Sequence, residues 1–305
     1  MNLEAPDSRG PDRRTSLLAA LALLAVTAMW GSTFFLIRDL LDRVPVLDFL
    51  ALRFAIASAA LFAIAPRAVR RLSRASLRHA VVLGLLYGVA QILQTAGLAH
   101  TPASVSGFIT GTYVVATPLF AAVLLRSRIT HVTWLAVALA MGGLAVLSLS
   151  GLSVGYGQAI TFVAALLYAL HIFGLGAWSN AAETMGMAIV QLVMIALVSF
   201  VVTAPNGIVL PNRTGDWLSV VYMALFAGAL AMVAQTWAQA HLAPTRTAII
   251  MSMEPVFAAL FAVLLGGEQA TGRMLVGGVM VLTAMLVVEL APRSRIEAEV
   301  PHLAL

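Results

Sequence analysis

The chain contains no cysteine and no lysine, and charged residues make up only 10% of its 305 positions. Without cysteine it has no disulfide, iron–sulfur cluster or thiolate metal site. Soluble domains carry about 25% charged residues, whereas 61% of this chain is apolar. We therefore predict an integral membrane protein.

Two signatures of enzymatic chemistry are also absent from the sequence, the P-loop GxxxxGK[ST] and the zinc-protease motif HExxH. The chain therefore has no P-loop through which to couple transport to ATP hydrolysis. It also lacks paired aspartates placed to face each other, which an intramembrane protease would need. We predict that it is not an enzyme and that it uses no cofactor and no metal.

Ten apolar runs follow one another along the chain, each near the length of about 20 residues that crosses a bilayer as a helix. They cover 17–37, 47–65, 78–98, 103–125, 132–150, 157–178, 186–204, 217–240, 246–265 and 272–290. None shows the alternation of a membrane β-barrel, and a helix satisfies every backbone hydrogen bond in lipid. We predict an all-α integral membrane fold with ten transmembrane helices.

The eighteen basic residues are all arginine, and they are unevenly distributed between the two sides of the membrane. Thirteen lie in the tails and loops on the side of the N-terminus, four lie in loops on the other side, and Arg53 lies within the second span. The positive-inside rule then places both termini in the cytoplasm. The basic run at 67–79 is a short loop between two spans, so we predict no nucleic-acid partner.

A short sequence motif occurs twice, as QTAGLAH at 94–100 and as QTWAQAH at 235–241. Gln, Thr, Ala and His recur in the same order 141 positions later. Each copy belongs to a set of five spans, and because five is odd, the second set crosses the membrane in the opposite sense. Inverted repeats of this kind place a substrate site near the midplane at their interface. The predicted organisation is an N-terminal tail at 1–16, a first repeat at 17–150, a second repeat at 151–290 and a C-terminal tail at 291–305.

Four stretches resemble a known family: MWGSTFFLIRDL, LDFLALRFAIA, GFITGTYVVATPLFAAVLL and PTRTAIIMSMEPVFAALFAVLLGGE. Over nearly its whole length the chain is similar to the EamA type of the drug/metabolite transporter (DMT) superfamily. The resemblance implies a ten-helix inverted-repeat fold, a prokaryotic inner membrane, and export of small metabolites or amino acids. The fourth span ends in RSRIT, where the family pattern often has a glutamate, and the second half keeps that acid as Glu268.

Polar side chains within the spans mark the candidate site, because such groups usually face the bundle interior or a wet cavity. Thr110 and Tyr113 share one face of the fourth span. The 141-residue offset matches Tyr113 to Glu254 in the ninth span. We expect Glu254 either to accept a coupling proton or to pair with a substrate ammonium group. The alternative is a carboxylate that is hydrogen-bonded between packed helices.

Two glutamines, Gln94 in the third span and Gln235 in the eighth, are also matched by the 141-residue offset. Neutral amides bind amino, carboxyl or hydroxyl groups without a fixed charge preference, as a broad exporter requires. We predict that both line the cavity. The alternative is hydrogen bonding between helices, which contributes only about 0.6 to 2 kcal/mol per contact.

An offset of 138 matches Trp30 in the first span to Tyr168 in the sixth, and His171 lies one turn beyond Tyr168. An aromatic ring beside a cavity can stack on a ring or a cation, whereas aromatic residues near span ends belong to the interfacial belt. His171 either relays protons or is a structural, hydrogen-bonded histidine. All three are cavity candidates.

Four further residues have predicted structural roles. Arg53 lies about one turn inside the second span, near Asp48 at its end, and we predict an ion pair between them. An anion-binding role for Arg53 is the alternative. Pro118 and Pro255 are candidate hinges in the fourth and ninth spans, because proline removes a backbone donor.

These features favour a secondary transporter that exports small metabolites, amino acids or drug-like solutes across the inner membrane. Its expected partners are a small-molecule substrate, the lipid bilayer and, as candidate coupling ions, protons, with monomer and homodimer both open. The alternatives are an intramembrane enzyme, a non-transporting scaffold, or an uptake carrier with the same fold. A scaffold would not need paired polar faces.

Overall fold

The computed structural model describes residues 13–124, 131–150, 153–178, 182–239, 241–242 and 250–290. Its helices are α1 (Arg13–Leu41), α2 (Val46–Ile64), α3 (Arg74–Leu98), α4 (Ala103–Gly111), α5 (Tyr113–Leu124), α6 (His131–Ser148), α7 (Tyr156–Trp178), α8 (Thr184–Thr203), α9 (Thr214–Ala224), α10 (Ala231–Gln239), α12 (Glu254–Leu264) and α13 (Gly272–Leu290). The shorter elements are η1 (Val69–Arg71), η2 (Ala204–Asn206), the π-helical turn η3 (Leu225–Leu230), and the antiparallel strands β1 (Leu149–Ser150) and β2 (Ser153–Val154).

Six helical segments of the described chain are long and apolar enough to cross a membrane. They are α1, α2, α3, α7, α8 and the continuous run of α9, η3 and α10. The apolar helices α6, α12 and α13 have shorter apolar segments, so the count of ten crossings stays a prediction. Large apolar side chains such as Leu218 and Val279 are exposed on the outside of the bundle, as expected for helices that face lipid.

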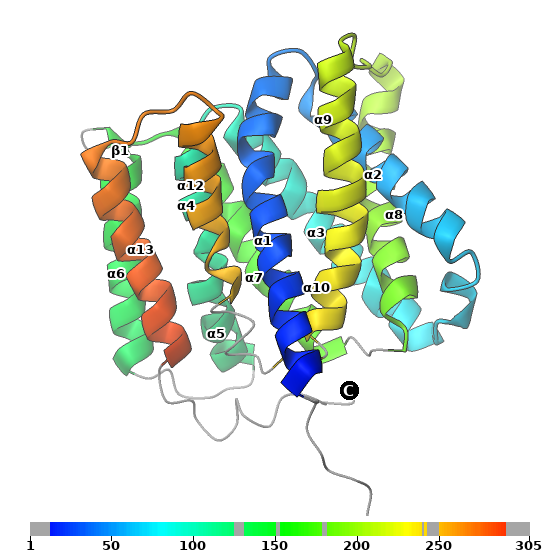
Figure 1. Ribbon diagram of the computed structural model, residues 1–305, viewed down its shortest axis with the longest axis horizontal. Coiled ribbons are helices and arrows are strands. Elements are labelled where there is room, and N and C mark those ends of the chain that lie inside the picture. Colours follow the sequence, from blue (N-terminus) through cyan, green and yellow to red (C-terminus); the bar gives the residue numbers. More distant parts are fainter. Residues whose placement is uncertain are drawn as a thin grey trace, which may run out of the picture.

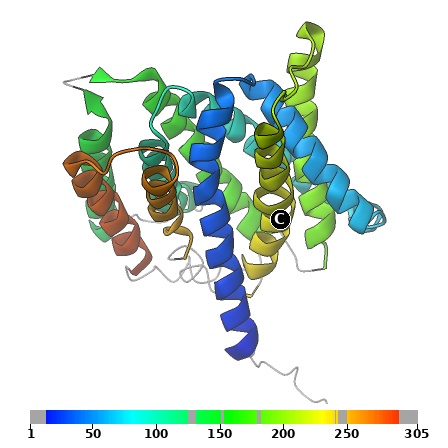
Figure 2. The ribbon, with the colours of Figure 1, turned by 45° about the horizontal axis from the view of Figure 1, so that its top comes forward.

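The helices pack side by side in a single bundle (Figure 1). Helices α6 and α13 contact each other at one edge, and α2 and α8 contact each other toward the opposite edge, with α1, α3 and α7 between them. Helix α1 begins and α13 ends at the same side of the bundle, which Figures 1 and 2 show at the bottom. We call this side the lower face, and the side that carries β1 and the α12–α13 connection the upper face.

The fourth and ninth predicted spans are both interrupted. Thr112 separates α4 from α5, and a turn at Ser252–Met253 precedes the first residue of α12, Glu254. The 141-residue offset matches Thr112 to Met253. The first residues of the predicted ninth span, 246–249, lie outside the described residues.

Close helix contacts occur where two glycines face each other. At the contact of α6 with α13, a Cβ added to Gly143 would lie 2.9 Å from the carbonyl oxygen of Gly277, and a Cβ added to Gly277 would lie 2.9 Å from the carbonyl oxygen of Gly143. Only glycine permits this approach of two helix backbones, as in the small-residue contacts of membrane helices.

Candidate functional site

A small cavity of about 50 Å³ lies among α1, α2, α3, α4, α5, α7, α10 and α12. It has room for a few water molecules, and it is smaller than the range of about 300–1,000 Å³ that is typical of small-molecule sites. The structure brings all eight predicted cavity residues to its wall: Trp30, Gln94, Thr110, Tyr113, Tyr168, His171, Gln235 and Glu254.

A carboxylate and a phenol meet at the two helix interruptions. The hydroxyl of Tyr113, the first residue of α5, donates a hydrogen bond of 2.9 Å to Oε2 of Glu254, the first residue of α12. Both side chains are buried. Because a carboxylate at the start of a helix is stabilised by the helix dipole, the local backbone favours an acid at position 254.

A second hydrogen-bonded chain crosses the cavity wall through Gln94 of α3. The hydroxyl of Tyr168 donates to Gln94 Oε1 at 2.8 Å, and Gln94 Nε2 donates to the hydroxyl of Thr110 at 3.0 Å. Three helices, α7, α3 and α4, are thereby joined by one amide. Gln94 therefore makes interhelical hydrogen bonds and also faces the cavity, so the two roles proposed for it are compatible.

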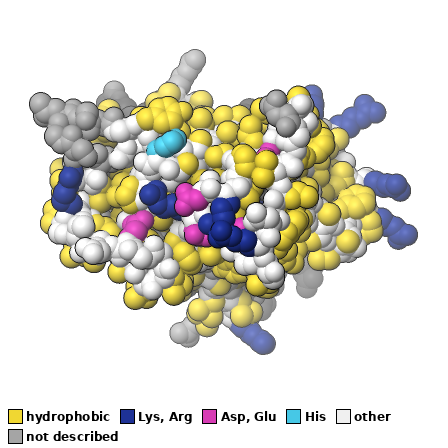
Figure 3. All heavy atoms as spheres, turned by 90° about the horizontal axis from the view of Figure 1, so that it is seen from above, with side chains coloured by type: hydrophobic (Ala, Val, Ile, Leu, Met, Phe, Trp, Pro, Cys, Tyr) yellow, Lys and Arg dark blue, Asp and Glu magenta, His cyan; other side chains and the backbone are white. Residues whose placement is uncertain are grey.

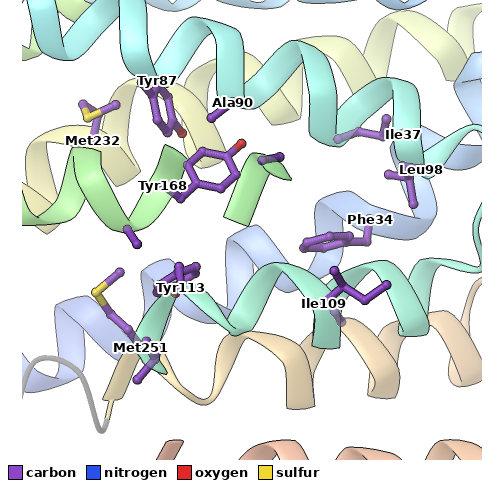
Figure 4. Close-up of a cluster of buried hydrophobic side chains, with 14 of the residues drawn as sticks. Phe34, Ile37, Tyr87, Ala90, Leu98, Ile109, Tyr113, Tyr168, Met232 and Met251 are labelled. Atoms are coloured by element: carbon purple, nitrogen blue, oxygen red, sulfur yellow. The ribbon is translucent and has the colours of Figure 1, made fainter. Parts of the chain in front are cut away.

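His171 is held by a neighbouring helix. Its Nε2 lies 2.8 Å from Oε1 of Gln191 in α8, and its ring centroid lies 4.8 Å from that of Tyr87. Tyr87 also lies 5.5 Å from the ring of Tyr168 and accepts a hydrogen bond from Gln91. Figure 4 shows Tyr87 and Tyr168 beside each other in the cavity region. His171 is thus a buried, hydrogen-bonded histidine in the wall.

Two backbone carbonyls near the π-helical turn η3 accept side-chain hydrogen bonds from the other half of the chain. Trp30 Nε1 donates to the carbonyl of Ala227 at 3.0 Å, and Arg53 Nε donates to the carbonyl of Met223 at 3.3 Å. A π-helical turn interrupts the regular hydrogen-bond pattern of a helix and often occurs at functional sites. Helix α1 continues to Leu41, so Trp30 lies in its interior rather than at its end.

The structure differs from the predicted pair of Arg53 and Asp48. Asp48 accepts hydrogen bonds from the hydroxyl of Thr203 and, at 3.0 Å, from the backbone N–H of Val209. Arg53 instead lies in the cavity wall. The physical reason is helix geometry, because two residues five positions apart lie about 140° apart around an α-helix. Their side chains consequently point to different neighbours.

The two candidate hinge prolines occupy different positions in their helices. Pro255 lies in the first turn of α12, where the missing N–H costs no helical hydrogen bond, so the interruption precedes this proline. Pro118 lies within α5.

Gln235 in α10 is buried, lines the cavity, and has no hydrogen-bond partner among the described residues.

Several residues of the wall lie outside the predicted set of cavity residues. Tyr87 and Gln91 line the cavity together with Gln94, at the i, i+4 and i+7 positions of one helix face, so helical spacing back from Gln94 indicates them. Phe34 and Ile37 follow Trp30 at the same spacings on α1. Nothing in the local sequence distinguishes these two apolar residues from ordinary packing residues.

The wall combines one buried cation, one buried carboxylate, amides, hydroxyls and aromatic rings. Such a surface can bind a small solute by charge, by hydrogen bonds and by ring contacts. Within the described part of the chain, no group of three or more histidine, aspartate or glutamate side chains is placed to hold a metal ion.

Comparison with known proteins identifies the family. The chain matches the EamA-like transporter family over residues 17–149 and 155–290. It is 28% identical to an uncharacterized transporter of Archaeoglobus fulgidus, with 90% of this chain and 86% of that protein covered. It is 26% identical to the uncharacterized inner membrane transporter YedA of Escherichia coli K12, with 87% and 89% covered.

Two further similarities extend this result. The chain is 27% identical to a probable terminal-alkyne amino-acid exporter of Streptantibioticus cattleyicolor, with 88% of this chain and 93% of that protein covered. A solved crystal structure aligns with a TM-score of 0.63 at 19% identity, with 89% of this chain and 96% of that chain covered, which shows a shared fold. The chain belongs to the EamA-like transporter family and is a multi-pass membrane transporter, as the sequence motifs predicted.

Proposed function

We propose that this protein exports a small organic solute across the inner membrane by alternating access. In this proposal, ten helices form two oppositely oriented halves, 17–150 and 151–290, with both termini in the cytoplasm. The cavity between them is the substrate site. The observation that carries the proposal is that polar groups from both halves, among them Gln94 and Gln235, line a single cavity.

The packing partners support the arrangement of two related halves. Helix α3 packs against α7, and its counterpart α10 packs against α1, which is the counterpart of α7. The pairs α2 with α8 and α6 with α13 each join one helix to its own counterpart, and α4 packs against α12, so that the fourth predicted span contacts the ninth. A two-fold relation between the halves produces this exchange of partners.

The hydrogen bond between Tyr113 and Glu254 also supports this arrangement. These two residues are 141 positions apart, the offset of the repeat. Equivalent residues of two symmetry-related halves touch each other only near the symmetry axis. In an inverted-repeat transporter that axis lies in the membrane plane and passes through the substrate site.

The direction of transport is inferred from the relatives. One is named an inner membrane transporter and another a probable amino-acid exporter.

Purified full-length protein in proteoliposomes, supplied with a panel of amino acids and drug-like solutes, tests the proposal. We expect solute flux that exceeds that of empty liposomes and that changes with an imposed pH gradient if protons are coupled. Absence of flux for the whole panel would contradict export.

Cysteine accessibility tests the cavity independently of substrate identity, because the natural chain has no cysteine. Single cysteines at Gln94, Thr110, Tyr113 and Gln235 should react with a small polar thiol reagent in native membranes. A cysteine at Ala136, which is buried in α6 away from the cavity, is the matched control and should not react. If all four cavity positions stay unreactive, the proposed substrate pathway is wrong.

A further inference from the structure

We propose that Arg53 binds the carboxylate of the transported solute and that Glu254 binds its ammonium group, so that the cavity selects apolar α-amino acids as zwitterions. This inference rests on the proposed transport function and specifies its substrate class. It assigns Arg53 to substrate recognition in place of the structural ion pair that its position in the sequence suggests.

Arg53 is a buried arginine with spare hydrogen-bond donors. Only 3% of its surface is exposed, and it lines the cavity. Its Nε donates to the Met223 carbonyl. Its two terminal nitrogens have no hydrogen-bond partner among the described residues. They are also absent from the described side-chain atoms that are both fully buried and unpartnered, so each keeps some accessible surface. The terminal N–H groups therefore border the cavity, and a guanidinium presents them in the fork geometry that fits a carboxylate.

The surroundings of Arg53 hold it in place without neutralising it. Its guanidinium carbon lies 5.0 Å from the ring centroid of Phe54 and 5.8 Å from that of Phe49. These ring faces attract a cation but carry no negative charge. The salt bridges of the described chain involve Arg43 and not Arg53. Because an unpaired buried charge is costly, a bound anion that pairs with Arg53 is favoured.

Glu254 supplies the complementary charge in the same cavity. It is buried, accepts one hydrogen bond from Tyr113, and makes no salt bridge to Arg53. A carboxylate accepts more than one hydrogen bond, so an ammonium group still finds acceptor positions on it. Tyr87 and Tyr168 line the same cavity as both charges.

One solute that carries both charges satisfies Arg53 and Glu254 together. An amine alone leaves Arg53 unpaired, and an acid alone leaves Glu254 unpaired, so each loses affinity relative to the zwitterion. The remaining wall contains Phe34, Ile37 and Met251. These residues favour an apolar side chain on the solute, and leucine and phenylalanine are therefore suitable probes.

The test compares three matched solutes on the full-length protein: L-leucine, 3-methylbutylamine, which lacks the carboxylate, and 4-methylpentanoate, which lacks the amino group. Binding to the purified protein and flux in proteoliposomes are both measured. We expect L-leucine to bind at least about 30-fold more tightly than either analogue, since a buried charge left unpaired usually costs this much or more. L-phenylalanine should bind like leucine.

The Arg53→Gln variant should lose L-leucine affinity by a similar factor while 3-methylbutylamine binding stays unchanged or improves. Arg53→Lys keeps the charge without the fork and should recover part of the leucine affinity. Arg71→Gln removes an exposed arginine of η1 and serves as the matched control, with wild-type selectivity. Gel filtration and thermal unfolding identify any variant that fails to fold, and the comparison of solutes on the wild-type protein does not depend on the variants.

The outcomes separate the two proposals. Leucine binding with the expected selectivity but without flux would contradict the transport function and support the assignment of Arg53. Flux without discrimination between leucine and the amine would overturn the inference and leave transport intact. The inference is also overturned if the wild-type protein binds neither leucine nor phenylalanine, or if Arg53→Gln keeps wild-type selectivity.

Discussion

The hydroxyl of Tyr113 donates a hydrogen bond to Glu254 at 2.9 Å, and this bond joins the start of α5 to the start of α12. Replacing Tyr113 with Phe keeps the ring and removes the donor. We expect the affinity for ammonium-bearing solutes to fall about tenfold, because hydrogen bonds to charged groups contribute roughly 1.5–3 kcal/mol. The half-saturation concentration for L-leucine flux measures the effect.

Tyr222→Phe is a suitable control, because it removes a hydroxyl that lies 2.8 Å from the Ser32 hydroxyl and is not part of the cavity wall. This variant should keep wild-type affinity. An unchanged half-saturation concentration for Tyr113→Phe would show that the bond to Glu254 does not orient the carboxylate for binding.

Substitution of Glu254 with Gln tests whether this group titrates during transport. Glu254 is the one carboxylic acid in the described cavity wall. We expect wild-type flux to vary with pH, and we expect Glu254→Gln to give low flux that varies little with pH, since an amide neither binds nor releases a proton. Flux measured over a series of pH values gives the answer.

Glu183→Gln is the matched control for this pH experiment. Glu183 accepts hydrogen bonds from the backbone N–H of Ser73 and the hydroxyl of Ser76 at the start of α3, outside the cavity wall. The control should keep the pH profile of the wild-type protein. A Glu254→Gln protein with wild-type rate and wild-type pH dependence would remove Glu254 from the mechanism.

The contact of Gly143 with Gly277 predicts a loss of stability on adding a single methyl group. In Gly143→Ala, the new Cβ would lie 2.9 Å from the Gly277 carbonyl and 2.9 Å from Cγ2 of Val281. Overpacking of this kind costs about 1–3 kcal/mol, which exceeds the gain in helix propensity of about 0.5–1 kcal/mol. Thermal unfolding in detergent should show a lower midpoint.

Gly176→Ala in α7 is the opposite case, because nothing lies within 4 Å of an added Cβ there. Its unfolding midpoint should be unchanged or raised. If both alanine variants shift the midpoint in the same direction, tight packing at Gly143 does not control the stability of the α6–α13 contact.

The membrane class, the family and the eight cavity residues could be predicted because each has a local signal in the sequence. Polar residues such as Gln94 and Glu254 are rare in apolar spans and therefore conspicuous. The sequence left two roles open for Arg53, an ion pair with Asp48 and an anion site, because the orientation of its side chain depends on the carbonyl of Met223, 170 positions away. No proline occurs at the interruption at Thr112, so nothing in the local sequence marks it.

Charged residues on the upper face form a connection across the bundle (Figure 3). Arg43, between α1 and α2, contacts Asp216 of α9 at 2.7 Å and also bonds Asp39. Nearby, Arg38 donates to the carbonyls of Leu98 and Thr101 between α3 and α4. Hydrogen bonds to Asp216 and Asp39 raise the pKa of Arg43 above its ordinary value, so its charge persists throughout the neutral pH range.

These contacts predict that the upper face opens when the Arg43–Asp216 pair is removed. In a Thr110→Cys background, we expect Arg43→Gln and Asp216→Asn to increase labelling by a charged thiol reagent that is applied from the upper face. Arg71→Gln on the α2–α3 connection, at the opposite face, should not increase it. High salt should raise labelling only slightly in the otherwise wild-type protein, because ions screen a largely buried charge pair less than an exposed one, and should have little further effect in Arg43→Gln. Equal labelling of all four proteins at low salt would show that the pair does not close this face.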